Sequence, residues 1–346
     1  MKITKTHIIK YYRLLTDMSS FKYVKEYCIK GDKPLKAIPT YFDSLWCKLR
    51  YGMTTKEYFL FDFYNKSGYA RRTYVSGAES SWTIENIIDA GNKYPFGQKF
   101  NVYQAFKPFY RREAIKLTLP DECNELAAFA HKYSGFILKP LSMSQGRGIC
   151  IWSQNMDDAE NVLTEMCKSS KGEVIVEELI QQDESMASFH PSSINTIRYT
   201  VDYQDGYVDK IYAMIRIGAG DSQVDNTSAG GICAAIDLDT GIIISKGFRR
   251  DGKQYIYHPD SGKQIIGTKI PKWDELNETI EKIRPKDTSV HFIGWDMALS
   301  KDGWCIVEGN WNPAIIGVQA SSGIGYRSAL IRARKNARKT WKFGNK

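Results

Sequence analysis

An α+β fold with largely antiparallel sheets is the class that the sequence predicts, and two observations point to it. In residues 1–65, aromatic and aliphatic side chains recur every three to four positions, which is typical of amphipathic helices. From residue 136 onward, short apolar runs are separated by turn residues, which indicates strands. These strands and the few helices between them do not alternate strictly, so the sheets are expected to be largely antiparallel.

The composition predicts a folded chain of two or three domains. Its 346 residues are 42% hydrophobic and 25% charged, which excludes disordered and low-complexity proteins. No uncharged apolar run approaches the ~18 residues of a membrane span, and Lys10 and Arg13 interrupt the basic start before a signal-type apolar core forms. The seven scattered cysteines form no CxxC pair, so we expect reduced thiols in a cytoplasmic protein rather than a disulfide framework or a zinc knuckle.

Along the chain, the helical N-terminal region is followed by a loop-like stretch at 66–97 that contains only a short helix at 84–90. A further helix is expected at 121–133, where a glycine ends the apolar stripe. The later elements follow the change of periodicity: strands at 136–139, 149–152, 174–177, 194–203, 208–217, 291–299 and 304–308, a hairpin at 232–244, and helices at 158–167 and 273–284.

The net charge of +9 is unevenly distributed. Bases exceed acids in residues 1–120 and in the tail from Arg327, whereas acids exceed bases between them. An acidic centre suits an active site that needs a cation, and the basic ends are either solvated or in contact with anions, a membrane surface or a partner. A tail helix over 329–341 has too few apolar residues for a membrane face, so we expect it to be solvated.

Common nucleotide-binding and hydrolase motifs are absent from the sequence. It contains no P-loop, no three-glycine dinucleotide fingerprint and no GxSxG, and its five histidines are isolated. One Gly-rich segment remains, which begins at Lys139 at the end of a strand and includes Gln145, Gly146 and Gly148. Its glycines would let backbone N–H groups approach phosphate oxygens beside the lysine, although a Gly-rich hairpin is also a common structural feature.

The apolar strand near residue 175 ends in acidic residues. Glu177 and Glu178 close the apolar run, and Glu184 follows after a short linker. Backbone groups of such a linker can pair with the edge of an adenine, and a carboxylate a few residues later can hold ribose hydroxyls. The alternative is a buried strand with an acidic exit.

The last predicted hairpin carries the most informative pattern. If its turn is a three-residue loop, Ser300 pairs with Trp304, and Asp296 then lies opposite Glu308. Opposite Cβ atoms are ~4.5–5.5 Å apart, so the two carboxylates would repel each other. Asn310 points to the same face, and the three oxygen ligands together suit Mg²⁺. A two-residue turn would shift the register by one, and a solvated hairpin edge is the alternative.

Two arginines complete the candidate site. Strand alternation places Arg198 on a polar face with Thr196 and Thr200, and it places Arg216 on the face opposite Ile215. Beside phosphates each arginine would stabilise developing negative charge, whereas elsewhere each would be an ordinary surface residue.

The order of these motifs resembles the ATP-grasp superfamily, and within it the sugar-transfer-associated ATP-grasp proteins of bacterial surface-polysaccharide loci. The motifs are Lys-Pro before the Gly-rich turn, Glu-Glu-Leu-Ile at 177–180, Asn-Thr-x-Arg at 195–198, Arg-Ile-Gly at 216–218, and Trp-Asp with Glu-x-Asn at 295–310. The segment from Asp225-Asn226 to Gly230-Gly231 also looks typical of that group.

The resemblance implies an ATP-grasp fold, in which two α+β subdomains grip a nucleotide, together with a helical N-terminal region. The expected divisions are the helical region at 1–90, a first subdomain with a phosphate lid at 91–180, a second with the metal site at 181–325, and a basic tail at 326–346.

The resemblance also implies that the protein binds ATP and Mg²⁺. Phosphates would be contacted by Lys99 and Lys139, and covered by a lid that includes Gln145, Gly146 and Gly148. The adenine hinge would consist of Glu177, Glu178, Leu179 and Ile180, with Glu184 on the ribose. Mg²⁺ would be held by Asp296, Glu308 and Asn310. Many ATP-grasp ligases carry an arginine where this chain has Gly294, so Arg198 or Arg216 would supply the catalytic charge.

The reaction implied is ATP-dependent ligation of a carboxylate to an amine through an acyl phosphate. The carboxylate would be a uronic acid or similar group in bacterial surface-polysaccharide biosynthesis, and the amine that of an amino acid or amino sugar. Contact with the inner membrane face or with polysaccharide-assembly machinery is left open, and nucleic-acid binding is not expected. The alternatives are a phosphotransferase that acts on a sugar, and a non-catalytic nucleotide-binding module that docks through its basic ends.

Overall fold

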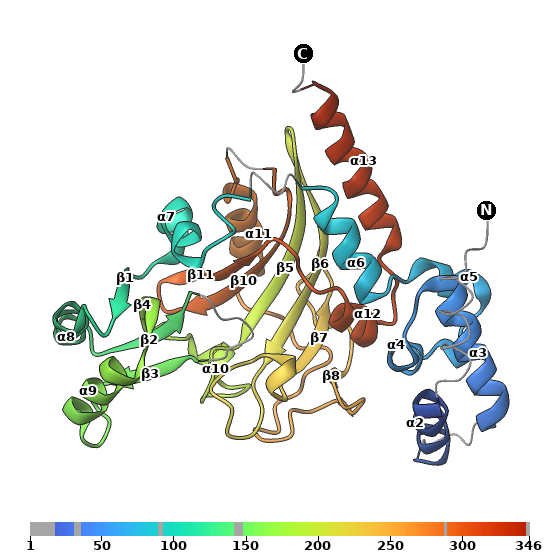
Figure 1. Ribbon diagram of the computed structural model, residues 1–346, viewed down its shortest axis with the longest axis horizontal. Coiled ribbons are helices and arrows are strands. Elements are labelled where there is room, and N and C mark those ends of the chain that lie inside the picture. Colours follow the sequence, from blue (N-terminus) through green and yellow to red (C-terminus); the bar gives the residue numbers. More distant parts are fainter. Residues whose placement is uncertain (1–17, 31–35, 89–92, 142–147, 287–288, 344–346) are drawn as a thin grey trace.

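The computed structural model describes residues 18–30, 36–88, 93–141, 148–286 and 289–343. Among these residues, antiparallel strands form two sheets of unequal size, and a group of helices lies at one end of the molecule (Figure 1). The predicted α+β class is confirmed.

The smaller sheet has four antiparallel strands in the order β1-β4-β2-β3. Their bounds are Ala114–Leu119 for β1, Gly135–Pro140 for β2, Cys150–Ser153 for β3 and Gly172–Glu178 for β4. Helices α8 (Cys123–Lys132) and α9 (Ala159–Ser169) pack against this sheet and share one apolar core with it. The strands and helices predicted for this part of the chain are confirmed with small changes at their ends.

A disulfide joins the two helices of the smaller sheet, between Cys123 in α8 and Cys167 in α9. The expectation of reduced thiols is therefore wrong for this pair, because the fold brings together two cysteines that are 44 residues apart in sequence. The other five cysteines are free.

The larger sheet has seven antiparallel strands in the order β11-β10-β5-β6-β7-β8-β9. Their bounds are Thr196–Gln204 for β5, Tyr207–Ile217 for β6, Ile232–Ile236 for β7, Gly247–Arg249 for β8, Gln254–Tyr255 for β9, Phe292–Ser300 for β10 and Gly303–Asn310 for β11. Every residue of β10 is buried, as are all residues of β5 except the last. Such strands need a covering layer on both faces.

The two faces of the larger sheet differ in chemistry. On one face, Tyr199 of β5 stacks on Trp273 of α11 (Trp273–Lys282), and Trp295 of β10 contacts Phe106 of α7 (Lys99–Tyr110). The opposite face carries the polar residues of β5, and helix α12 (Ile316–Ser322) packs against the neighbouring strands β6 and β7. Period-two alternation therefore separates an apolar face from a polar, buried one.

The N-terminal region is helical, as predicted. It contains α2 (Met18–Lys30), α3 (Ala37–Tyr51), α4 (Thr55–Leu60), the short 3-10 helix η1 (Phe63–Asn65), α5 (Gly68–Thr73) and α6 (Gly77–Glu85). The loop-like stretch expected after residue 66 is wrong, because Ser67 and Ser76 each accept a hydrogen bond from a backbone N–H and so start α5 and α6. The helix expected at 84–90 lies mostly beyond the end of α6, and its last residues are outside the described part.

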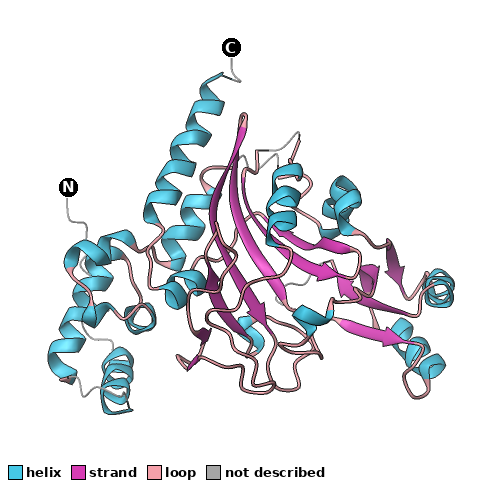
Figure 2. Cartoon of the chain, turned by 180° about the vertical axis from the view of Figure 1, so that it is seen from behind, coloured by secondary structure: helices cyan, strands magenta, loops and turns pink. Residues whose placement is uncertain are grey.

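The basic tail forms helix α13 (Arg327–Phe343), but the expectation of a solvated helix is wrong for one of its sides. Ala329, Leu330 and Ala333 are buried in the core of the larger sheet. Figures 1 and 2 show α13 beside α6 and the long β5–β6 hairpin. The tail is thus part of the folded core, and in the described residues no helix is long and apolar enough to cross a membrane.

Asp202 of β5 is buried under α13, where Asn336 donates a hydrogen bond of 3.4 Å to it. Burial, together with the facing Asp209, raises the pKa of Asp202 to about 6. In the unfolded chain, an aspartate carboxyl has a pKa near 3.9. The ionisation of Asp202 therefore lowers the free energy of unfolding above about pH 6, and this loss disappears as the pH falls toward 4.

We expect Asp202→Asn to raise the free energy of unfolding at pH 7.5 by about 1–3 kcal/mol, because about two pKa units separate the two states. Urea denaturation at pH 7.5 and at pH 4 measures this, and the gain should vanish at the lower pH. The exposed turn variant Asp205→Asn is the control. An equal gain at both pH values would contradict a protonation effect.

Candidate active site

The β10–β11 hairpin places Asp296 opposite Glu308, as predicted from the sequence. The turn, however, is the shorter one: Ser300 pairs with Gly303, and the expected pairing with Trp304 is wrong. A β-bulge next to Asp296 adds one residue on β11 and shifts the register back. The two carboxylates therefore face each other because of the bulge and not because of the turn.

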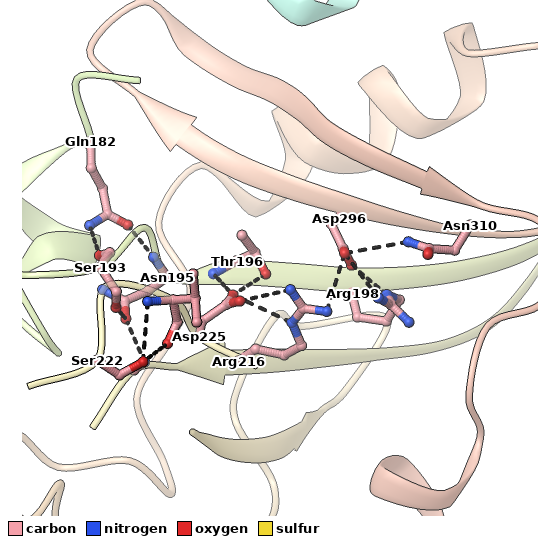
Figure 3. Close-up of polar contacts among 12 residues, drawn as sticks. Gln182, Ser193, Asn195, Thr196, Arg198, Arg216, Ser222, Asp225, Asp296 and Asn310 are labelled. Carbon is pink, nitrogen blue, oxygen red and sulfur yellow. Dashed lines mark hydrogen bonds and ion pairs between the residues drawn. The ribbon is translucent and has the colours of Figure 1, made fainter. Parts of the chain in front are cut away.

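Asp296 is the centre of a buried ion cluster on the polar face of the sheet (Figure 3). Its side chain is 2% exposed. Arg198 donates hydrogen bonds to both carboxylate oxygens, from Nε to Oδ1 and from Nη2 to Oδ2 at 2.9 Å. Nη1 of Arg216 lies 3.2 Å from Oδ2, and Nδ2 of Asn310 lies 3.4 Å from the same oxygen. Four of the predicted site residues are thus in contact.

The electrostatic balance of this cluster differs from the repulsion expected between two carboxylates. Burial disfavours the charged form of Asp296, but Arg198 and Arg216 outweigh this effect and hold the pKa of the carboxyl below its usual value. Asp296 is therefore ionised at neutral pH and pairs with two cations on the neighbouring strands.

Sequence reasoning gave no role to Asp225, which holds Arg216 in place. Nη2 of Arg216 lies 2.7 Å from Oδ1 of Asp225, and the backbone N–H of Thr196 donates to Oδ2 at 3.1 Å. Asp225 comes from the connection after β6 and is 5% exposed. Its only signal was the Asp225-Asn226 pair quoted for the family resemblance, because a loop residue cannot be placed by strand alternation.

Gly294 leaves room for Arg198. A Cβ atom at residue 294 would lie 3.0 Å from Cδ of Arg198 and 2.6 Å from Cβ of Pro313. The space that a longer side chain would need at this position is therefore occupied by an arginine that comes from the adjacent strand β5. Of the two arginines considered from the sequence, Arg198 is the one that lies against Gly294.

The residues around Asp296 fit a magnesium ion in their donor chemistry. Asp296, Glu308 and Asn310 offer carboxylate and amide oxygens, which are the ligands that Mg²⁺ prefers. The described residues contain no cluster of three or more His, Cys, Asp or Glu side chains that could hold a metal by themselves. The amide oxygen of Asn310 would be the third ligand beside the two carboxylates.

The two candidate lysines lie near the same site, on its side toward the smaller sheet. Nζ of Lys139 is 2.7 Å from Oε1 of Glu177, and Nζ of Lys99 is 3.4 Å from the backbone oxygen of Pro140. Burial lowers the pKa of Lys99, and the nearby charge of Glu308 opposes that shift. Glu308 thus lies near Lys99 and opposite Asp296.

Glu177 is buried, and its carboxylate is held by two cations. Nε of Arg112 donates to Oε2 at 3.0 Å, and Nη1 of the same arginine donates to the backbone oxygen of Ile306 at 2.6 Å. Although burial opposes ionisation, Lys139 and Arg112 lower the pKa of Glu177 to about 2. Arg112, which sequence reasoning missed, thereby joins β4 of the smaller sheet to β11 of the larger one.

The segment after Glu177 crosses from one sheet to the other. The N–H of Leu179 donates to Gly135 of the smaller sheet at 3.3 Å, and the N–H of Asp183 donates to Leu299 of the larger sheet at 2.9 Å. This connection contains Glu178, Leu179 and Ile180, which are half-buried. These are three of the four residues that the family resemblance assigns to the adenine hinge. 

Two other candidate residues, Glu184 and Gly148, are not brought into these contacts, and two more lie outside the described part of the chain. Glu184 is exposed at the start of the short helix α10 (Glu184–Ala187). Gly148 is exposed just before β3 with φ +69°, and Gln145 and Gly146 lie outside the described residues. 

We expect Gly294→Ala to lower the free energy of unfolding by about 1–3 kcal/mol, because the new methyl group overlaps Pro313 and displaces Arg198. Chemical denaturation measures this change. Gly317→Ala is the matched control, since its added Cβ has no neighbour closer than 3.5 Å. If the two variants are equally stable, the space beside Arg198 can accept a methyl group, which would contradict the prediction.

Comparisons with known proteins place the chain in a family. Residues 92–335 match the family described as sugar-transfer associated ATP-grasp, and no curated protein matches the sequence. Similar solved structures include D-alanyl-alanine synthetase A from Vibrio cholerae, with TM-score 0.43, 11% identity, and coverage of 70% of this chain and 65% of that one. They also include D-alanine–D-alanine ligase from Bacillus anthracis, with TM-score 0.39, 17% identity and coverage of 72% and 69%.

A third similar structure is the ATP-grasp ligase PsnB complexed with its minimal precursor, with TM-score 0.39, 12% identity, and coverage of 76% of this chain and 64% of that one. The matched part of this chain therefore spans about two thirds of the length of these proteins. At such identities and TM-scores the likenesses do not bear on the reaction. The family match, by contrast, extends over both sheets and most of the chain, and the protein belongs to the sugar-transfer associated ATP-grasp family and has the ATP-grasp fold.

Proposed function

We propose that the protein is an ATP-dependent ligase that joins a carboxylate to an amine through an acyl phosphate. The observation that carries the proposal is the cluster of Arg198, Arg216, Asp296 and Asn310, which lies beside Glu308 and Lys99 in a chain of the ATP-grasp family. The substrates we propose are a uronic acid or similar carboxylate and an amine of an amino acid or amino sugar, in bacterial surface-polysaccharide biosynthesis in the cytoplasm.

The proposed reaction has two steps. A carboxylate oxygen of the substrate attacks the γ-phosphorus of ATP, and the bond to the β-phosphate oxygen breaks, which gives an acyl phosphate and ADP. The amine then attacks the acyl carbon, loses a proton and expels phosphate. The products are an amide, ADP and phosphate in equal amounts. Bound at Asp296, Glu308 and Asn310, Mg²⁺ would neutralise phosphate charge.

The arginines suit the stabilisation of negative charge at the transferred phosphoryl group. The ion pair with Asp296 uses Nε and Nη2 of Arg198, so Nη1 lies outside that pair. Asp225 fixes the orientation of Arg216 from the other side. Guanidinium groups that are already oriented need no reorganisation when charge develops, which is how preorganised donors accelerate a reaction.

The lysines suit the binding of a nucleotide. Lys139 is held by the ionised Glu177, so its charge is fixed in position at the edge of the smaller sheet. Lys99, the first residue of α7, lies near both Lys139 and Glu308. We propose that both ammonium groups contact phosphates, with the connection at 178–180 lying along the adenine.

The stoichiometry of the products tests the reaction. Purified protein is incubated with ATP, Mg²⁺, a panel of uronic acids and a panel of amines, and ADP and phosphate are both quantified. We expect equal amounts of the two, with dependence on both the carboxylate and the amine. ADP without free phosphate would indicate a sugar phosphotransferase, and nucleotide binding without any turnover would indicate a docking module.

Two variants test the metal residues in the same assay. Glu308→Gln and Asp296→Asn are each expected to reduce turnover by about 100-fold or more, since each removes charge that acts on the transferred group. Glu308 is half-buried and outside the ion cluster, so its variant should fold even if Asp296→Asn does not. The exposed variant Asp251→Asn is the control. Full ligation by Glu308→Gln would overturn the metal assignment.

A further inference from the structure

The outer side of helix α3 carries an exposed apolar stripe. Ile38, Phe42, Trp46 and Leu49 are 62%, 61%, 57% and 46% exposed. Their spacing of four, four and three residues places them on one side of the helix, over a length of about 16 Å. The opposite side of α3 is also apolar, and it is buried in the core of the N-terminal region.

A helix that is apolar on both sides needs a second apolar environment. The buried side of α3, with Tyr41 and Leu45, packs against α2 and α4. Helix α3 itself lies at the end of the molecule opposite the smaller sheet (Figures 1 and 2). An object bound there would leave the Asp296 cluster accessible.

Charge indicates what this second environment is. The stripe has Lys36 before its first residue and Lys48 and Arg50 at its last turn. The single acid of α3, Asp43, is neutralised by Arg71 at 2.7 Å and also accepts a hydrogen bond from Tyr58 at 2.7 Å. Lys48, however, follows the buried Tyr41 by seven residues and so lies on the inner side of the helix. The outer side is therefore apolar along its middle, with Lys36 before its first turn and Arg50, four residues after Trp46, beside its last turn.

This pattern fits an anionic lipid surface better than a protein. A helix lying in the interface buries a narrow apolar side among acyl chains, while lysine and arginine side chains reach the headgroups. A stripe one helix wide is small beside the ~800 Å² per partner of a stable protein interface. Acidic headgroups complement the basic ends.

We propose that α3 is a docking surface for membranes that contain anionic lipids, through Ile38, Phe42, Trp46 and Leu49 with Lys36 and Arg50. The protein binds the bilayer peripherally, with its catalytic sheets held off the surface. This inference does not depend on the proposed ligase reaction, and its readout is binding rather than turnover.

Vesicle co-sedimentation tests the proposal. The full chain is mixed with vesicles of phosphatidylcholine alone and with vesicles of phosphatidylcholine and phosphatidylglycerol in equal parts. We expect at least about tenfold tighter binding to the anionic vesicles, weakened by added salt, because each base near the surface contributes. If the chain binds neither kind of vesicle, the proposal is wrong.

Two double variants separate the apolar and the charged contributions. Phe42→Ser with Trp46→Ser should reduce binding to anionic vesicles by about tenfold or more, and Lys36→Gln with Arg50→Gln should remove most of the preference for them. The matched control is Tyr207→Ser with Ile324→Ser, which changes exposed apolar residues elsewhere. Unchanged binding by the first double variant would assign the membrane contact to another part of the chain and overturn the proposal.

Light scattering tests whether a second copy of the chain covers the apolar stripe instead of a membrane. We expect a monomer in the absence of lipid. A dimer that the Phe42→Ser, Trp46→Ser variant dissociates would show that the stripe is a protein interface and would overturn the proposal. Quenching of tryptophan fluorescence by brominated lipids, compared between the natural chain and Trp46→Phe, gives an independent measure: no difference between them would count against insertion of α3.

Discussion

The burial of one carboxylate, Asp296, constrains the centre of the larger sheet. A charge in the interior requires a partner, and here two guanidinium groups come from the two strands next in order, β5 and β6. Arg198 reaches the carboxylate because Gly294 leaves it space, and Arg216 reaches it because Asp225 holds its far side. In proteins, replacing a buried ion pair with apolar residues of similar volume is often neutral or stabilising. Stability alone therefore does not explain the arrangement, whereas the reaction proposed above would use these charges.

A second buried carboxylate, Glu177, takes part in contacts that join the two sheets, whereas Asp296 joins neighbouring strands of one sheet. Arg112 connects it to the backbone of β11, and Lys139 connects it to the end of β2. Because its pKa is about 2, Glu177 stays ionised throughout the range in which proteins function, so both contacts persist. The residue that the sequence suggested as part of an adenine hinge is thus held in place by two cations from different elements.

Local rules predicted much of the fold and part of the site. Alternation in β5 and β6 placed Arg198 and Arg216 on one face, and the hairpin pattern paired Asp296 with Glu308. The pairing survived a wrong turn length only because a β-bulge, which no turn rule predicts, restored the register. Asp225, Arg112 and the Cys123–Cys167 pair could not be predicted, because each depends on contacts between segments far apart in sequence. The buried side of α13 was missed because alanines, which need little space, make most of it.

The N-terminal region is tied to the catalytic part of the chain rather than appended to it. Gln319 of α12 is fully buried, and its amide exchanges two hydrogen bonds with the backbone of Val75, at 3.1 and 2.8 Å. Arg327 at the start of α13 pairs with Glu79 of α6. Helix α12 follows directly after β11, the strand that carries Glu308 and Asn310. Oε1 of Gln319 also accepts a hydrogen bond from the backbone N–H of Tyr326 at 3.3 Å, so one side chain connects the N-terminal region, α12 and the segment before α13. The helices that carry the exposed apolar stripe of α3 are therefore anchored to the segment that follows the proposed metal residues in the chain.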